Sequence, residues 1–200
     1  MNQNVLNRTS TATIVREMLK RKPYVRYALE QNIANMSAVA RLIQKDIKDT
    51  NIEAVKAALI RETNKLSYKR KMRDEVVIDI LKNSKILIQD KISVVTSERK
   101  VDLPYLVMAK LSDSFVYIVD QTKIPRIKKE GLVLSRDLNA VFISSVDDIG
   151  EIPGFIAFLT NILASEDINI KEFISCYTDT VIILTQEDAI KAFTILKRYG

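Results

Sequence analysis

Apolar positions recur at helical spacing through the first third of the chain. This repeat predicts a first helix from Thr11 to Arg21. A second helix is predicted over residues 23–31, because Pro23 suits the first turn of a helix. Residues 1–9 show no repeat and are expected to form a tail.

Two further helices are predicted after a break at residues 32–36. Ser37 is the expected N-cap of the third helix, because its hydroxyl can accept a backbone N–H, and apolar residues then recur as far as Ile47. Asn51 is the expected cap of the fourth helix, and a connecting helix is expected to run on to Leu81.

The hydrophobic period changes after Lys85, where β-branched residues become frequent. Residues 86–88 and 92–95 predict two strands around a break at 89–91. Asp102 is the expected cap of a helix that continues to Leu111, and strands are predicted at 115–119 and 132–134. Residues 84–138 therefore predict a β-α-β lobe.

The last third of the chain predicts the order β-α-β-β-α. A strand at 140–146 precedes a polar turn at 147–154, and apolar residues then return at helical spacing as far as Ala164. Strands at 172–177 and 181–185 precede a second helix, whose first turn is acidic as the helix dipole favours. This order is most of a ferredoxin-like unit.

The turn at 147–154 has the features of an anion site. Pro153 is expected in the first helical turn, and Gly154 lets a ligand approach the start of the helix because it has no side chain. Free N–H groups at a helix N-terminus favour an anion such as an amino-acid carboxylate, and Asp147 or Asp148 would hold the ammonium. The alternative is that these residues only cap the helix and allow tight packing.

Charge divides the chain into two parts. Residues 1–75 carry 16 Lys and Arg against 8 Asp and Glu, a net charge of +8, and the remainder carries 15 against 17, a net charge of −2. A basic first third joined to a slightly acidic remainder predicts two modules with different partners.

A helix-turn-helix is one interpretation of the second and third helices, because a short turn joins them. Arginine and glutamine can pair with base edges, and lysine can neutralise phosphates. The alternative is an ordinary solvated helix face, since the turn lacks glycine and no aromatic residue is interleaved. The basic run at 69–73 is interpreted as the solvated face of the connecting helix rather than as a phosphate contact. The candidate DNA-binding residues are Ser37, Arg41, Gln44, Lys45 and Lys48.

The composition offers little catalytic chemistry. The chain has no histidine, and its four glycines do not form a nucleotide-binding loop. Cys176 lies in an apolar run and is expected to be buried and unreactive. We therefore expect neither an enzyme, nor a metal site, nor a cofactor.

The expected location is the cytoplasm. No secretion signal is visible, and the longest uncharged apolar stretch, at 152–165, is shorter than the ~18 residues that a membrane helix needs. A single cysteine excludes an internal disulfide framework.

The motifs of the last third resemble those of the ACT regulatory domain, and most closely the amino-acid-sensing ACT units of aspartate kinases. The resemblance covers about 60 residues and rests on 153–155, 163–164, 168–170, 178–181 and 188–189. It implies an amino-acid site on two loops. The implied ligand-binding residues are Asp147, Asp148, Ile152, Pro153, Gly154, Phe155, Ile168, Asn169 and Ile170.

The resemblance also implies a tandem of ACT units. The expected fold class is α+β, with a helical, helix-turn-helix-like domain followed by tandem ferredoxin-like βαββαβ lobes of the ACT type. The expected domains are residues 1–83, 84–138 and 139–200. The sequence ends after the second helix of the last unit, so the family's fourth strand must come from earlier in the chain or from a partner. A homodimer or larger homo-oligomer is therefore expected.

The expected function is amino-acid-responsive regulation, with the basic helical domain acting on double-stranded DNA as a ligand-sensing transcriptional regulator. The first alternative is a regulatory subunit that binds an amino acid and docks on a biosynthetic enzyme without binding DNA. An enzyme with a cryptic carboxylate site is the least favoured hypothesis.

Overall fold

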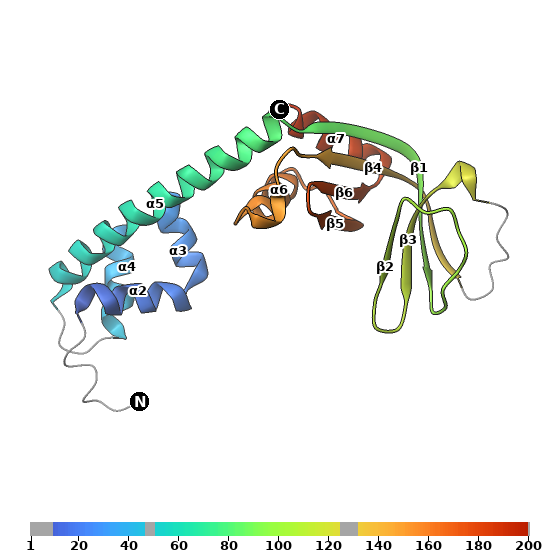
Figure 1. The fold of residues 1–200 in the computed structure, drawn as a ribbon. Coiled ribbons are helices and arrows are strands. Elements are labelled where there is room, and N and C mark those ends of the chain that lie inside the picture. The colour runs from blue at the N-terminus through green and yellow to red at the C-terminus, as the bar shows by residue number, and fades with distance from the viewer. Residues whose placement is uncertain (1–9, 47–50, 125–131, 200) are drawn as a thin grey trace. The chain divides into compact units, whose positions relative to one another are not determined.

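The computed structural model describes residues 10–46, 51–124 and 132–199. The chain divides into two compact units, Met1–Asp74 and Glu75–Gly200. One continuous helix of 31 residues, α5 (Ile52–Lys82), crosses the boundary between them (Figure 1). The expected domain limits at 83 and 138 stay predictions. No helix in the described part of the chain is long and apolar enough to cross a membrane.

The N-terminal unit is a helical cluster, as predicted. The first two helices are confirmed: α2 (Thr11–Arg21) begins after a Ser10 cap, and α3 (Pro23–Glu30) has its proline in the first turn. They pack with α4 (Met36–Lys45) and the first part of α5. Their shared core consists of Val15, Leu19, Leu29, Val39, Ala40, Ile43, Val55, Ala58 and Leu59.

The predicted Ser37 cap is wrong. The side chain of Asn35 caps α4 instead, accepting the N–H of Ala38 at 3.0 Å. Met36 packs against the core of the helical unit, so it lies on the inner face of the first turn. The helix therefore begins before Ser37. The Asn51 cap is confirmed, since its side chain accepts the N–H of Glu53 at 2.9 Å. The predicted tail at 1–9 and Ile47 lie outside the described residues.

The second unit contains one six-stranded antiparallel sheet. Its strands lie in the order β2-β3-β1-β4-β6-β5. Every neighbouring pair is antiparallel. The strands are β1 (Lys85–Ser97), β2 (Val107–Lys110), β3 (Phe115–Asp120), β4 (Leu132–Ser144), β5 (Glu172–Cys176) and β6 (Asp179–Leu184).

Two pairs of predicted strands are each one long strand. The predicted break at 89–91 is an irregularity within β1, where the register against β4 shifts between Gln89 and Ile92 and Lys91 has a φ of 54°. The predicted strands at 132–134 and 140–146 are likewise joined as β4, in which Asp137 has a φ of 56°. A bulge bends a strand without ending its pairing, so both strands curve through the sheet (Figure 1).

The helix predicted from Asp102 to Leu111 is also wrong. This segment ends in β2, which pairs with β3, and the Leu106 N–H donates to the Ile118 carbonyl at 2.8 Å. Intrinsic helix propensity is a weak preference that tertiary pairing overrides. The described residues of 84–138 contain no α-helix, so they extend the sheet and do not form the predicted β-α-β lobe.

The predicted β-α-β-β-α order of the last third is confirmed by β4, α6 (Phe155–Ser165), β5, β6 and α7 (Gln186–Leu196). The missing fourth strand is supplied within the chain. The first part of β1 pairs with β4, from Lys85 opposite Ser144 to Gln89 opposite Ala140, on the side of β4 away from β6. It takes the place beside the first strand that the last strand of a ferredoxin-like unit occupies.

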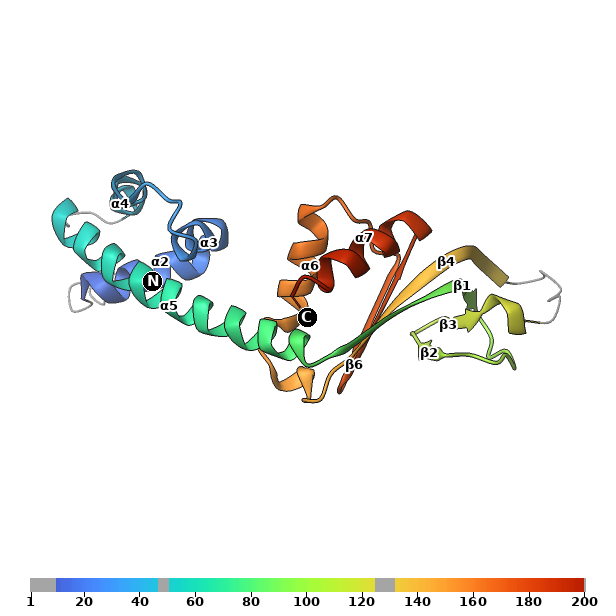
Figure 2. The same cartoon turned by 90° about the horizontal axis from the view of Figure 1, so that it is seen from above.

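One face of this part of the sheet is covered by helices. Figures 1 and 2 show α6 and α7 on the same side of the strands. Ile86, Val141, Ile143, Ile182 and Leu184 contribute the sheet side of this core. The helices contribute Phe155, Leu159, Leu163, Ala189, Ala192 and Leu196, and the end of α5 adds Val77, Ile80 and Leu81.

Substitutions at two neighbouring positions of β1 test whether this strand packs against the helices. Ile86 is 3% exposed and packs under the helices, whereas Leu87 points to the other face and is 48% exposed. Ile86→Ala is expected to lower the free energy of unfolding by about 2–5 kcal/mol because it leaves a cavity. Leu87→Ala is expected to cost about 1 kcal/mol or less. Urea denaturation measures both values, and equal losses would contradict the packing of β1 beneath the helices.

Candidate functional site

The loop between β4 and α6 is held on the turn that joins β5 to β6. The Ser145 N–H donates to the Thr178 carbonyl at 2.8 Å, and the Ile149 N–H donates to the Tyr177 carbonyl at 3.0 Å. Ile149 is buried in the core beneath this turn. The loop is therefore anchored at both its start and its middle.

The two predicted aspartates differ in their contacts. The carboxylate of Asp148 accepts the Gly150 N–H at 2.9 Å and caps a short 3₁₀ turn, η2 (Ile149–Glu151). Asp147 is exposed and makes no hydrogen bond or ion pair with a described residue. Asp147 is therefore the better placed carboxylate for a ligand, because part of Asp148 is committed to the loop.

Gly154 has the left-handed conformation that glycine favours. Its φ is 93°, and it stands as the N-cap of α6, which begins at Phe155. The prediction that Pro153 lies inside the first helical turn is wrong, because this left-handed residue separates it from the helix. Pro153 and Gly154 are both exposed.

The N-terminus of α6 offers free donors. The Phe155 N–H bonds to the Ile152 carbonyl and the Phe158 N–H to the Gly154 carbonyl. The N–H groups of Ile156 and Ala157 meet no acceptor among the described residues. Such donors, together with the helix dipole, suit a carboxylate.

The loop and the turn that holds it carry charge of one sign, although Lys85 of β1 pairs with Ser144 at the start of the loop. Residues 137–170 contain no lysine or arginine, whereas Asp147, Asp148, Glu151 and Asp179 lie on the loop or the turn that holds it. Asp179 is bound by two hydroxyls, accepting from Ser144 at 2.6 Å and from Thr178 at 3.2 Å. These carboxylates favour a ligand ammonium, which leaves the helix N–H groups to bind its carboxylate.

The predicted site residues do not all meet within one chain. The Ile168 N–H donates to the Leu163 carbonyl, so Ile168 lies at the C-terminal end of α6. The pairing of β5 begins at Lys171, at the opposite end of the sheet from Ser144. A helix of 11 residues is about 16 Å long, so Asn169 and Ile170 lie far from Gly154. Phe155 and Ile168 are 1% and 6% exposed and belong to the core. Ile152 and Ile170 are half-buried against the same core.

A buried pair of serines joins the loop to the end of α5. Ser145 Oγ lies 3.0 Å from Ser84 Oγ, and Ser84 donates to the Ile80 carbonyl at 2.7 Å. Nothing in the sequence marked Ser84 or Ser145, because they are 61 residues apart and neither lies in a recognisable motif. The pairing of β1 with β4 brings them together.

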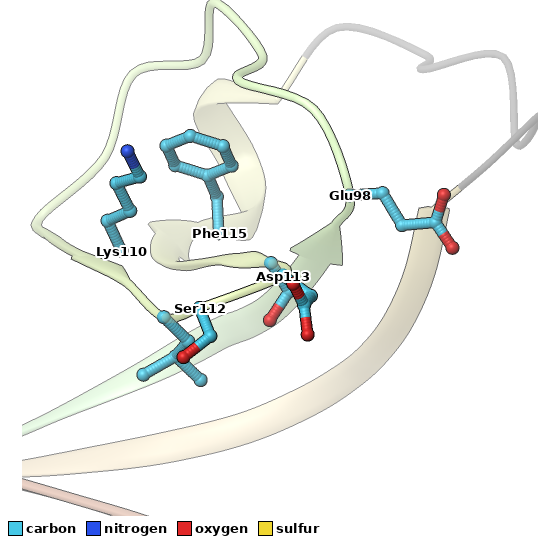
Figure 3. A pocket seen from close by; sticks show the side chains of 7 residues that line it. Glu98, Lys110, Ser112, Asp113 and Phe115 are labelled. Carbon is cyan, nitrogen blue, oxygen red and sulfur yellow. The ribbon is translucent and has the colours of Figure 1, made fainter.

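An open hollow of about 500 Å³ lies elsewhere, at the end of the β2–β3 hairpin (Figure 3). Glu98, Lys110, Ser112 and Asp113 are among its lining residues, and Lys110 lies beside the Phe115 ring at 5.9 Å. It contains none of the predicted site residues.

The described candidate DNA-binding residues share one side of α4 but differ in exposure. Arg41 and Lys45 are exposed one turn apart, whereas Ser37 and Gln44 are half-buried. Neither Arg41 nor Lys45 forms an ion pair with a described residue. Lys48 lies outside the described residues. Among the described candidates, Arg41 and Lys45 are therefore the residues accessible to a DNA partner.

Comparison with known proteins identifies the last third of the chain. The family model for the ACT domain matches residues 134–198, which span β4 to α7. Residues 134–198 form an ACT domain. The predicted motifs of this segment therefore belong to the family that they resemble. No curated protein gives a significant match to the sequence.

Several distant solved structures are similar to part of this chain. One is the Clostridium acetobutylicum aspartate kinase, with 11% identity over 57% of this chain and a TM-score of 0.48. The E. coli aspartokinase III structure, a complex with aspartate and ADP, also has 11% identity over 57% of this chain and a TM-score of 0.48. This chain covers only 34% and 32% of those two proteins. It covers 95% of the regulatory subunit of aspartate kinase from Thermus thermophilus, with 13% identity over 57% of this chain and a TM-score of 0.45.

The ACT domain of this chain has a rearranged strand order along the sequence. Its matched segment ends with α7, and the strand beside β4 comes from β1, more than 40 residues before the match begins. Cys176 was expected to be buried in this domain, but it is exposed at the last position of edge strand β5. An edge strand leaves its outer side chains accessible at the end of its pairing.

Proposed function

We propose that this protein is an amino-acid-responsive transcriptional regulator. The ACT domain binds the amino acid at the loop 145–157, and the basic helical unit binds DNA. The observation that carries the ligand assignment is the N-terminus of α6. There a left-handed Gly154, two free N–H groups and the exposed Asp147 carboxylate provide complementary partners for an α-amino acid.

A homodimer would complete the proposed ligand site. Asn169 and Ile170 lie at the other end of α6 from Gly154, so one ligand contacts both groups only if two ACT domains meet. The helix α6 contains no charged residue, and Ile156 on its outer face is 49% exposed. Depletion of charge is typical of the centre of a protein interface, which makes α6 the favoured contact face.

The contacts of the loop with α5 give the signal a physical route. Ser145 bonds to Ser84 just after α5, and Ile149 belongs to the same core as Val77, Ile80 and Leu81 of that helix. A ligand that shifts the loop changes the packing at the end of α5. This helix continues into the basic unit, so ligand binding and DNA binding are coupled through it.

The alternative is a regulatory subunit that senses an amino acid and docks on a biosynthetic enzyme. The exposed apolar residues of the helical unit favour it, since Tyr24 is 89% and Ile33 is 75% exposed. The excess of cations in residues 1–75 favours DNA. Salt-dependent binding to duplex DNA distinguishes the two.

A thermal-shift series with the twenty amino acids tests the sensor. A ligand that binds only the folded protein raises its stability by RT ln(1 + [L]/Kd), which is about 2.7 kcal/mol at one hundred times Kd. Asp147→Asn is expected to reduce the shift because it removes the charge that faces the ammonium, whereas Asp113→Asn, the same change on the β2–β3 hairpin, leaves it unchanged. Gly154→Asn keeps a left-handed conformation and is expected to abolish the shift by covering the helix N-terminus. A wild-type protein that responds to no amino acid would refute the sensor.

Sedimentation equilibrium tests the dimer. The full chain is expected to sediment at twice its 22.8 kDa mass or more at micromolar concentration. Ile156→Glu is expected to shift the equilibrium to monomer, because it places a charge at the centre of the proposed contact, and Lys191→Glu on α7 serves as the control. A wild-type monomer at high concentration would contradict the proposal.

Duplex binding tests the output of the helical unit. Arg41→Ala is expected to weaken specific binding by about 1–3 kcal/mol if Arg41 contacts a base edge, and to relax the sequence preference. Arg21→Ala, a change of equal charge on α2, is expected to have a smaller effect that does not depend on sequence. Electrophoretic mobility shifts against a random duplex pool measure both, and the absence of any retained duplex at 50 mM salt would refute DNA binding.

A further inference from the structure

Six of the fourteen cations in the described part of the first unit form ion pairs with neighbouring acids. Arg16 bonds to Glu62 at 2.8 Å, a contact in which the guanidinium lowers the pKa of the Glu62 carboxyl. Such pairs screen the positive charge of this unit over much of its surface. The remaining pairs are Lys20–Glu17, Lys22–Asp46, Arg26–Glu30, Lys56–Glu53 and Arg70–Asp74.

Four cations on α5 stand apart from this pattern. Arg61, Lys65, Lys69 and Arg73 are all exposed, and none forms an ion pair with a described residue. We call them the cation ridge. They recur every four residues, about 6 Å apart along the axis, so the ridge is about 18 Å long.

The regular spacing has an energetic consequence. Like charges four residues apart repel each other on a helix surface, and the ridge contains three such pairs in succession. No acid of α5 bonds to any of its four members. A partner with repeated negative charge would relieve this repulsion, whereas a single carboxylate would relieve only one pair.

An exposed aromatic residue lies beside the ridge. Tyr68 is 67% exposed and Met72 is 44% exposed, and each lies three residues after a member of the ridge, Lys65 or Lys69, on the same side of α5. Aromatic side chains among cations are typical of surfaces that bind nucleic acid, where they stack on bases or sugars. This interleaving is the feature that α4 lacks.

We propose that the cation ridge binds the phosphate backbone of a nucleic acid, with Tyr68 packed against a sugar or an unpaired base. Repeated cations over about 18 Å fit a backbone that carries a phosphate about every 3.4 Å of axis on each strand. A membrane-bound helix needs a continuous apolar face, whereas the exposed apolar residues of α5, Ile60, Tyr68, Met72 and Val76, are interrupted by the polar Asn64. This proposal and the proposed function both have a nucleic acid as partner, but this one assigns the contact to α5 rather than to α4.

The test compares variants of equal charge in the full-length protein. The ridge variant is R61Q/K65Q/K69Q/R73Q, and the control is K85Q/K100Q/K197Q/R198Q, which removes four exposed cations from the other unit. Fluorescence anisotropy measures the affinity for a labelled duplex and for a labelled single strand at 50–300 mM salt. Circular dichroism checks that each variant is folded, and the double variant K65Q/K69Q replaces the ridge variant if four changes disturb the helix.

The salt dependence is the decisive readout. The ridge variant is expected to bind at least tenfold more weakly at 100 mM salt, and the slope of log K against log salt should fall by about 0.9 for each duplex phosphate that the variant no longer neutralises. The double variant should show about half of this decrease in slope. Tyr68→Ala should weaken single-strand binding about fivefold or more without changing the slope.

Each of the other possible binding results contradicts one part of the proposals. If the ridge variant and the control lose the same affinity, net charge alone binds the nucleic acid and the ridge is no site. If Arg41→Ala abolishes binding and the ridge variant does not, the ridge fails while the proposed function stands. If the ridge variant loses binding and Arg41→Ala does not, the ridge stands and the role of α4 fails. Retention on anionic phospholipid vesicles, with no binding to either nucleic acid at 50 mM salt, would overturn the nucleic-acid partner altogether.

Discussion

The pairing of β1 with β4 is the constraint on which the second unit depends. It supplies the strand that the ACT motif lacks at its own end, and it places Ile86 beneath the helices that cover Val141 and Ile143. Because β1 directly follows α5, the same pairing brings Ser84 to Ser145. The closure of the sheet and the contact between the loop and α5 therefore have one physical origin. A change that weakens this pairing should affect both stability and any coupling between ligand and helix.

Local patterns predicted the elements whose structure is set by nearby residues. The limits of α2 follow from a Ser10 cap and a clear apolar face, and the start of α3 follows from Pro23 in its first turn. The errors fall where partners distant in sequence decide. Lys91 lies in a bulge rather than a turn because β4, some 45 residues later, continues to pair on both sides of it. The segment before Lys110 is a strand because β3 offers it a ladder, although its local pattern suits a helix.

In the candidate site too, the sequence predicted roles that depend on nearby residues and missed those that depend on distant contacts. The sequence indicated Asp147 and Gly154, whose roles depend on one loop, but it grouped them with Asn169, which lies at the other end of α6. It also assigned Phe155 and Ile168 to the ligand, whereas the apolar character that made them noticeable buries them in the core. The basic run at 69–73 was interpreted as solvated surface, yet Arg70 pairs with Asp74 while Lys69 and Arg73 remain without ion pairs to described residues. Only the contacts separate the cations that stabilise the fold from those that are free to bind a partner.

We propose that an amino acid binds at the start of α6 and that the effect passes to α5. Amide hydrogen exchange of the full chain, with and without a saturating amino acid, tests both parts in one measurement. Exchange is expected to slow at Ile156 and Ala157, whose N–H groups would gain an acceptor, and to change at Ser84 and the last turn of α5. Protection confined to the β2–β3 hairpin, or protection of the loop with no change in α5, would contradict this proposal.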